Sequence, residues 1–407
     1  MVRGYALAWV AYVVAAGIIS RSARPPRGAL VWIVVVAIGL RLVCLARTPA
    51  LSTDMWRYLW DGRVANAGIN PYRYAPDAPQ LRHLRDDNWQ SINFKPISTI
   101  YPPAAQVMFM ALARVREADA EAFRWTFALF DIGSIALLIC LLRRTGRPPE
   151  RVVWYAWCPL AVTEVTAGAH VDAAGLFLLL LAFALAARSG GRPGPASAAA
   201  LAGAVMTKGY AVLAAPFLLR RGGWRALPWL TLPCLLLIAP YLGVGGQLFG
   251  GLHAYVARWK VNSSVFFLLD RMLEAVTPLH FEITRAVTIA LVIAVTAWLV
   301  WRQGSGVEGL IKASFAAIFA QLLLGAPTLP WYVVWVAPAL CWWTIPSGVL
   351  FTFTVSAQYY ARWLYPGDPA AHDRLLLAGY LPVYALLLGQ LILWRLRLRR
   401  SGPSRIP

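Results

Sequence analysis

Apolar runs of about 16 to 22 residues recur along the whole chain, and short polar segments separate them. A helix rises 1.5 Å per residue, so about 20 apolar residues cross the hydrocarbon core of a bilayer, which is about 30 Å thick. Inside lipid every backbone polar group must find a partner within the protein, and a helix meets this requirement by itself. The pattern therefore predicts an all-α polytopic membrane protein.

The runs predict about 13 transmembrane helices. We expect the N-terminus outside the cytoplasm and the C-terminus inside it. The predicted spans are residues 5–20, 28–46, 121–142, 151–166, 171–188, 196–207, 209–220, 224–243, 283–302, 309–325, 330–345, 347–361 and 375–395.

The run "IYPPAAQVMFMALARV" (100–115) is an exception. As a helix it would reach only about 24 Å at 1.5 Å per residue, which is short for a bilayer. If it crossed the membrane, the basic segment 143–151 would also move to the outside. We therefore expect a juxtamembrane helix that lies in or dips into the outer leaflet, within a large first outer loop over residues 47–120.

The charge pattern sets this orientation. The chain has a net charge of +20, and only 14% of its residues are charged, against about 25% in soluble domains. Six short segments hold nearly half of the 38 basic residues, and by the positive-inside rule they face the cytoplasm. Because the loops account for the charge, nucleic acid is not expected as a partner. The segments are 21–27, 143–151, 188–192, 220–225, 302–312 and 395–400.

The outer loop 47–120 is rich in acids, so we expect any chemistry on the outer face. Its first part, "LSTDMWRYLWDGRVANAGINPYRYAPD" (51–77), crowds charged and aromatic residues directly after an apolar run. Ser52 and Thr53 can cap a helix that Gly68 ends. Asp54 would lie in the first turn, where the helix dipole favours a carboxylate. It is therefore either part of the cap or a catalytic base.

Neighbours on the same helix extend this candidate site. Arg57 and Tyr58 follow Asp54 at i+3 and i+4 and share its face. Asp61 is two turns farther on, about 10 Å away, which is too far for a shared proton. It would instead orient Arg57 or Arg63, or bind a sugar hydroxyl.

Polar residues at other predicted outer turns are further candidates. His170 and Asp172 lie at the junction of two apolar spans, where polar groups are costly unless they are used; an ordinary interfacial turn is the alternative. Lys208, between two short apolar segments, must either snorkel or meet an anion such as a lipid phosphate. Tyr101 and two prolines lie at the start of the juxtamembrane helix, where prolines fit the first turn. A rigid turn without further function is the alternative.

A later outer loop supplies cations. Arg258, Lys260 and Asn262 could form a second cationic wall, or attach an amphipathic segment to anionic lipids. Trp331 and Tyr332 lie at another outer turn, where an aromatic belt explains them equally well.

Several features exclude other chemistry. The five cysteines all lie in apolar runs without metal-ligand spacing, so we expect neither a disulfide framework nor a metal site. G-x-G-x-x-G, Walker, H-E-x-x-H and G-x-S-x-G motifs are absent, which disfavours nucleotide-driven chemistry. No cofactor is expected, and a divalent metal is not indicated. Asp131, in the middle of a predicted span, should be buried and paired inside the bundle.

Four motifs in order resemble the GT-C class of integral membrane glycosyltransferases. They are the acidic segment "DMWRYLWDGRVANAGINPYRYAPD", then "YPP", "TK" and "PWY". Within that class the first motif is similar to bacterial polyprenol-phosphate-mannose-dependent mannosyltransferases. The resemblance spans residues 28–395 as a transmembrane core with the outer catalytic loop 47–120. Residues 1–27 then form an extra span with a cytoplasmic loop, and 396–407 a basic cytoplasmic tail.

The resemblance implies a hexosyltransferase at the outer face of the bacterial cytoplasmic membrane. It would move a sugar, mannose by resemblance, from a polyprenyl-phosphate donor to a lipid or glycan acceptor, with inversion. Asp54 matches the catalytic acidic position, but Thr53 and Met55 replace the adjacent acid that the family often has. The residues expected to bind substrate are Arg57, Tyr58, Trp60, Asp61, Arg63, Tyr72, Tyr101, His170, Asp172, Lys208, Arg258, Lys260, Asn262, Trp331 and Tyr332.

Two other functions remain open at this point. A transporter or flippase would place ionisable residues and broken helices near the middle of the bilayer. A non-catalytic membrane subunit that binds lipid-linked glycans would need the same outer surface. An enzyme should lose turnover when Asp54 becomes Asn, whereas a binding subunit should be indifferent to that change.

Overall fold

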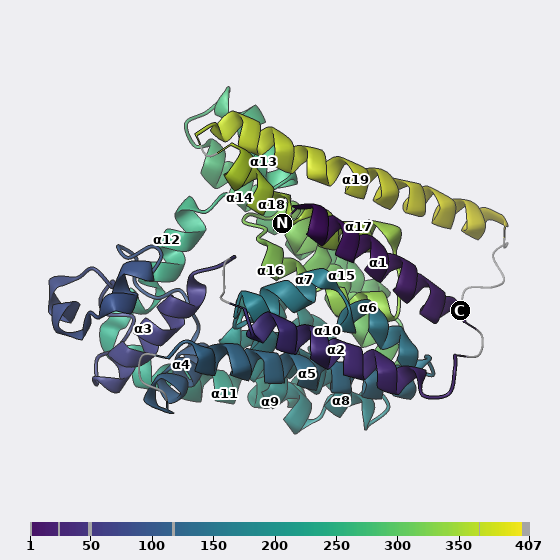
Figure 1. The fold of residues 1–407 in the computed structure, drawn as a ribbon, viewed down its shortest axis with the longest axis horizontal. Helices are drawn as coiled ribbons and strands as arrows, with labels where there is room; N and C mark the ends of the chain where they lie inside the picture. Colours follow the sequence, from purple (N-terminus) through teal and green to yellow (C-terminus); the bar gives the residue numbers. More distant parts are fainter. Residues whose placement is uncertain (1, 23–24, 48–50, 116–118, 366, 401–407) are drawn as a thin grey trace.

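The computed structural model describes residues 2–22, 25–47, 51–115, 119–365 and 367–400, and it is all-helical over these ranges (Figure 1). The helices of two turns or more are α1 (Val2–Arg21), α2 (Ala29–Leu45), α3 (Asp54–Asn66), α4 (Pro103–Val115), α5 (Glu121–Arg144), α8 (Asp172–Ala187), α9 (Pro195–Thr207), α10 (Ala215–Gly222), α11 (Leu227–Ile238), α12 (Gly250–Arg258), α13 (Val265–Glu274), α14 (His280–Arg302), α15 (Gly306–Leu324), α17 (Pro346–Thr354), α18 (Ala357–Leu364) and α19 (Pro369–Arg400).

Shorter helical turns connect them. The α-helical turns are α6 (Val153–Ala156), α7 (Pro159–Ala161) and α16 (Pro330–Val333). One π-helical segment, η4, covers Val162–Ala167. The 3-10 segments are η1 (Pro79–Leu84), η2 (Asp87–Ser91), η3 (Pro149–Val152), η5 (Gly209–Ala214), η6 (Trp224–Ala226), η7 (Ala239–Phe249) and η8 (Ala337–Cys341).

Every predicted span coincides with helical structure, but the number of 13 is not confirmed. In the described part of the chain, six helices are long and apolar enough to cross a membrane. A seventh span is possible if Pro159–Ala167 and α8, which meet at a bend of 120°, count as one. Pro159 begins α7 inside the predicted span 151–166, and Pro338 lies in the first turn of η8 inside the predicted span 330–345. Proline removes a backbone donor and clashes with the preceding turn, so such runs break into pieces.

Helices α3 and α4 form a platform beside the bundle, at the left of Figure 1. They pack so closely at Gly62 that a Cβ there would lie 2.2 Å from the carbonyl oxygen of Phe109. Only glycine permits this approach. Gly68, with φ +74°, ends α3 one residue after its C-cap, as the sequence predicts.

A buried ion pair joins α2 to α5 inside the bundle. Arg41 Nε donates to Asp131 Oδ2 at 2.7 Å, and the hydroxyl of Tyr155 donates to Asp131 Oδ1 at 2.5 Å. Arg41 and Asp131 are both fully buried. The prediction that Asp131 is buried and paired is therefore confirmed.

Asp131→Asn is expected to lower the free energy of unfolding by about 3–5 kcal/mol, because Arg41 would keep a buried charge without a counter-charge. Thermal unfolding of the detergent-solubilised protein measures the effect. The double variant Arg41→Met with Asp131→Leu should recover most of the stability, since apolar residues of similar volume replace a buried pair at little cost. Equal melting temperatures of the single and the double variant would contradict this account.

Candidate active site

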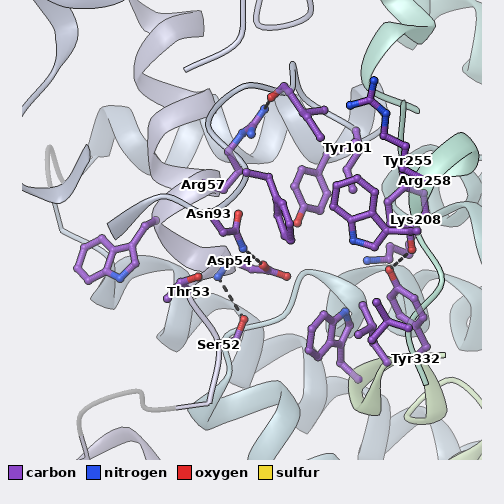
Figure 2. Close-up of a pocket in the computed structure, with 18 of the residues that line it drawn as sticks. Ser52, Thr53, Asp54, Arg57, Asn93, Tyr101, Lys208, Tyr255, Arg258 and Tyr332 are labelled. Carbon is purple, nitrogen blue, oxygen red and sulfur yellow. Dashed lines mark hydrogen bonds between the residues drawn. The ribbon is translucent and has the colours of Figure 1, made fainter. Parts of the chain in front are cut away.

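A cavity of about 720 Å³ opens where the N-terminal end of α3 faces α12 and α16. We call it the Asp54 cavity. In Figure 2, Asp54 and Asn93 lie on one side of it, and Lys208, Arg258 and Tyr332 lie on the other. Asp54 is the single acid among the described residues that line this cavity. One carboxylate therefore faces a wall of cations and aromatic rings.

Local structure holds the carboxylate of Asp54 in place. Asp54 is the first residue of α3, and its backbone N–H donates to Ser52 Oγ at 3.2 Å. Thr53 occupies the N-cap position but makes no capping hydrogen bond with its side chain. Asn93 Nδ2 donates to Asp54 Oδ1 at 2.6 Å. The predicted capping by Ser52 is thus present, and an amide from the following loop fixes one carboxylate oxygen.

The imidazole of His170 lies between two carboxylates. Its Nδ1 is 3.5 Å from Asp54 Oδ2, and its Nε2 is 3.6 Å from Glu164 Oε2. The ring is fully buried and stacks on Trp331, with 4.0 Å between centroids and 15° between planes. Tyr359 donates to Glu164 Oε2 at 2.9 Å. The result is a continuous polar row from Tyr359 to Asp54.

This row forms because the chain departs from regular α-helix between α7 and α8. Glu164 lies in the π-helical segment η4, and π-turns are often found at functional sites. Ala169 then takes a positive φ of 53°, and α8 begins at Asp172 after a sharp bend. The turn brings His170 toward the start of α3.

The charge state of Asp54 follows from its neighbours. Burial raises the pKa of this carboxyl, but the neighbouring His170, together with Asn93 and Lys208, outweighs it. The pKa of Asp54 is therefore lowered from its ordinary value. At neutral pH the side chain is a carboxylate, which can accept a proton.

Lys208 is held at the opposite wall. It follows α9 in extended conformation, and its Nζ lies 3.0 Å from Asp172 Oδ2. Trp335 donates to the other oxygen of Asp172 at 2.7 Å. The ammonium also lies 4.9 Å from the ring centre of Tyr332, a cation–π distance. Lys208 and Asp172, predicted from two separate turns, thus act as one positioned pair.

The other cations at this cavity differ in their pairing. Arg57 donates to Asp61 at 2.8 Å, and Lys260 pairs with Asp270 at 2.6 Å. Arg258 is exposed and makes no ion pair with any residue of the described ranges. Its charge is therefore the most available to an incoming anion.

The family comparison concerns the first half of the chain. Residues 1–221 match the model of the alpha-(1->6)-mannopyranosyltransferase family, N-terminal domain. The chain belongs to this family. The matched part of the chain contains Asp54, His170 and Lys208. Together with its apolar helices, this membership identifies a multi-pass membrane glycosyltransferase.

Other comparisons are sparser. None of the curated proteins matches this sequence. Among solved structures, the chain is similar to the crystal structure of ArnT from Cupriavidus metallidurans bound to undecaprenyl phosphate. The TM-score is 0.49 and the identity 18%, over 90% of this chain and 73% of ArnT.

Several predicted substrate contacts on α3 lie away from the Asp54 cavity. Tyr58 is fully buried and stacks on Phe109 at 4.5 Å. Trp60 packs in a separate apolar cluster with Val64. The helical period places these positions toward α4 and the outer loop instead of the cavity.

Four polar or aromatic candidates also lie away from the cavity, because each meets a partner within the chain. Asp61 is buried against Arg57, and Arg63 pairs with Asp86 at 2.7 Å. Tyr72 donates to the carbonyl of Tyr101 at 2.7 Å. Asn262, at φ 50°, donates to the carbonyl of Val355 at 3.4 Å. None of these four lines the cavity, so we assign them to support of the site.

The predicted residues that do line the Asp54 cavity, with Asp54 itself, are Arg57, Tyr101, Lys208, Arg258, Lys260, Trp331 and Tyr332. His170 and Asp172 lie directly behind it, against Asp54 and Lys208.

Sequence reasoning missed Glu164 and Asn93. Glu164 carried a usable signal, since a lone acid in an apolar run is costly and usually functional. Asn93 carried none, because an amide in a polar loop is unremarkable by itself.

The carboxylates of Asp54 and Glu164 lie at opposite nitrogens of His170, so these three side chains do not converge on one point. The described residues contain no group of three or more His, Cys, Asp or Glu that could hold a metal ion.

Proposed function

We propose that this protein transfers mannose from a polyprenyl-phosphate donor to a hydroxyl of a lipid or glycan acceptor. Family membership supports mannose as the sugar. The observation that carries the mechanism is the Asp54 cavity, in which one ionised carboxylate faces Lys208 and Arg258 across a space lined by aromatic rings.

Asp54 acts as the general base in this proposal. The acceptor hydroxyl must lose a proton as its oxygen attacks the anomeric carbon of the sugar. A carboxylate within hydrogen-bonding reach can take that proton. The hydrogen bond from Asn93 occupies only part of the lone-pair capacity of Asp54, since a carboxylate offers about four acceptor sites.

His170 and Glu164 position the base. Glu164 lies at one nitrogen of the imidazole and Asp54 at the other. In catalytic triads a third group likewise orients the base at hydrogen-bonding distance. Stacking on Trp331 holds the ring in plane. Neither residue needs to touch the substrate to exert this effect.

The phosphate of the leaving group would meet the opposite wall. A polyprenyl phosphate leaves as an anion, so no general acid is required. Lys208, fixed by Asp172, and Arg258, which has no ion pair among the described residues, would stabilise the growing negative charge. The hydroxyls of Tyr255 and Tyr332, 2.7 Å apart, lie beside this cationic wall.

A single displacement with inversion follows from the number of carboxylates at the Asp54 cavity. A retaining mechanism with a covalent intermediate would need a second carboxylate at the anomeric carbon. Asp54 is the one acid among the described lining residues, and the nearby Asp172 is paired with Lys208. We also propose that the reaction needs no cofactor.

The proposed location is the outer face of a bacterial cytoplasmic membrane. The basic loops are assigned to the cytoplasm by the positive-inside rule. The Asp54 cavity lies at the other ends of the helices, after the C-terminal end of α2.

Sugar transfer in membranes tests the function. Membranes containing the protein receive radiolabelled polyprenyl-phosphate-mannose or a radiolabelled nucleotide-mannose, with membranes lacking it as control. Label should pass to a new lipid or glycan product only from the polyprenyl-phosphate donor and only when the protein is present. Transfer from the nucleotide sugar, after polyprenyl-phosphate-mannose synthesis is blocked, would contradict the donor assignment. Absence of transfer from any donor would favour the binding-subunit alternative.

His170→Gln is expected to shift the acid limb of the pH–rate profile upward. Burial, the largest influence on Asp54, raises its pKa, and His170 contributes most of the opposing effect. Without the imidazole the pKa of Asp54 rises, so the base becomes protonated, and inactive, at a higher pH. Transfer rates measured across acidic to neutral pH report the shift. His253→Gln, an exposed histidine outside the cavity lining, is the control. Profiles that coincide for wild type and His170→Gln would remove this positioning role.

A further inference from the structure

A second cavity, of about 550 Å³, opens between α1, α17 and α19. We call it the Arg21 cavity, after the residue that ends α1. It lies at the end of the bundle away from Asp54, because α2 starts near the end of α1 and runs toward α3 (Figure 1). The site of sugar transfer therefore does not account for it.

The described side-chain hydrogen bonds that join helix α1 to the bundle come from its first half, whereas Ala16 and Ile19 of its second half contact the bundle through apolar packing. Tyr5 and Trp9 donate to the carbonyl and hydroxyl oxygens of Thr352, at 3.3 and 3.2 Å. Tyr12 donates to the carbonyl of Trp154 at 2.6 Å. Beyond Tyr12, no described side chain of α1 makes a hydrogen bond to another helix. The Arg21 cavity separates this second half from α17.

The cavity is apolar along its length and basic at one end. Trp9, Val13 and Leu350 contribute apolar walls, and Gly17 opens the wall on α1. A Cβ at Gly17 would meet only Arg21 Nη1, at 4.0 Å. From Trp9 to Arg21 the helix advances about 18 Å at 1.5 Å per residue. This length suits an extended hydrocarbon chain.

Two guanidinium groups at the basic end have no carboxylate partner among the residues that the structure describes. Arg151 donates to the carbonyls of Cys341 and Trp342 and to the hydroxyl of Thr344, all neutral acceptors. Arg21 forms no ion pair within the described ranges, and no described residue lining the cavity is acidic. Positive charge beside apolar surface at a membrane calls for an anion.

We propose that the Arg21 cavity binds one anionic glycerophospholipid of the cytoplasmic leaflet. The phosphate would lie between Arg21 and Arg151, because guanidinium groups bind phosphate oxygens in forked geometry. An acyl chain would fill the apolar length beside α1. Basic pockets between transmembrane helices on the cytoplasmic side are a known mode of headgroup recognition. The lipid would add contacts between the second half of α1 and the bundle to the apolar packing of Ala16 and Ile19.

Lipid retention by the purified full-length protein tests the proposal. The protein is delipidated in mild detergent, mixed with phosphatidylglycerol or phosphatidylcholine of the same acyl chains, and analysed by native mass spectrometry. Wild type should retain one phosphatidylglycerol at least about tenfold more than phosphatidylcholine, a difference that corresponds to about 1.4 kcal/mol.

Two variants probe the two parts of the site separately. Gly17→Leu should fill the apolar length, and Arg21→Gln should remove the exposed guanidinium; each should reduce phosphatidylglycerol retention about tenfold. Leucine is a better helix former than glycine, so Gly17→Leu should not weaken α1 itself. Gly39→Leu on α2, where a Cβ meets nothing within 4 Å, is the matched control. Arg151 is left intact because it supports the backbone at Cys341 and Trp342.

Equal retention of the two lipids by wild type would overturn the proposal. So would retention in both variants at the level of Gly39→Leu. If Gly17→Leu fails to fold, Arg21→Gln decides alone, since Arg21 is exposed and no packing depends on its charge. Sugar transfer does not enter this readout, so the result stands whether or not the proposed function is correct.

Discussion

Asp54→Asn should reduce kcat about 100- to 10,000-fold while donor binding stays nearly unchanged. This range is the usual contribution of a positioned general base. The variant is nearly isosteric, and its side-chain oxygen can still accept the hydrogen bond from Asn93. The loss would therefore report the missing proton acceptor and not a rearranged site. Sugar transfer at saturating donor measures it, with binding of the donor followed separately.

Asp77→Asn is the matched control for Asp54. Asp77 lies in the same outer loop and is exposed, outside the lining of the Asp54 cavity. It should transfer sugar at the wild-type rate. Equal rates for Asp54→Asn and Asp77→Asn, at equal expression, would remove Asp54 from the mechanism. A binding subunit would give that same indifference.

Removing the Lys208 ammonium should have the second-largest effect. Loss of one group that stabilises developing negative charge costs about 100- to 1,000-fold in kcat. Lys208→Met alone would leave Asp172 as a buried charge without its partner. The informative variant therefore combines Lys208→Met with Asp172→Asn. The transfer rate should fall, and polyprenyl phosphate should inhibit the double variant less strongly as a product. Both effects are expected because the Lys208 ammonium meets the phosphate of the leaving group.

Two comparisons separate charge from packing at Lys208. Asp172→Asn by itself keeps the ammonium and the hydrogen bond from Trp335, so it should retain much of the activity. Lys312→Met removes a lysine that lies outside the Asp54 cavity and should leave kcat unchanged. If the double variant turned over like wild type, the leaving-group assignment would be wrong.

The candidate site was partly predictable because some of its information is local. Asp54 at the start of α3 follows from Ser52, Gly68 and the apolar run before them, and neighbours along the chain decide such features. The pairing of Arg57 with Asp61 also follows from i, i+4 spacing. His170, Lys208 and Trp331 stood out because polar or aromatic residues at the ends of apolar runs are costly or interfacial.

Neighbouring residues along the chain do not decide which candidates face the Asp54 cavity. Tyr58 and Trp60 occur in the same motif as Asp54, yet α4 and the outer loop bury both. Arg258 and Lys260 are two residues apart. Lys260 forms an ion pair with Asp270, whereas Arg258 forms none among the described residues. Asn93 entered the site because the loop after η2 folds back onto α3.

By itself, the sequence determined the all-helical membrane class, the places of the apolar helices and the position of the catalytic candidate Asp54. Hydrophobic length, caps and charge bias act over one or two turns, so a linear pattern contains them. Only the tertiary structure decided that Glu164, His170 and Asp54 form one row, and that the predicted spans 151–166 and 330–345 are broken into short helices. These outcomes depend on how far-apart segments pack, because a buried charge is stable only where another part of the chain supplies its partner.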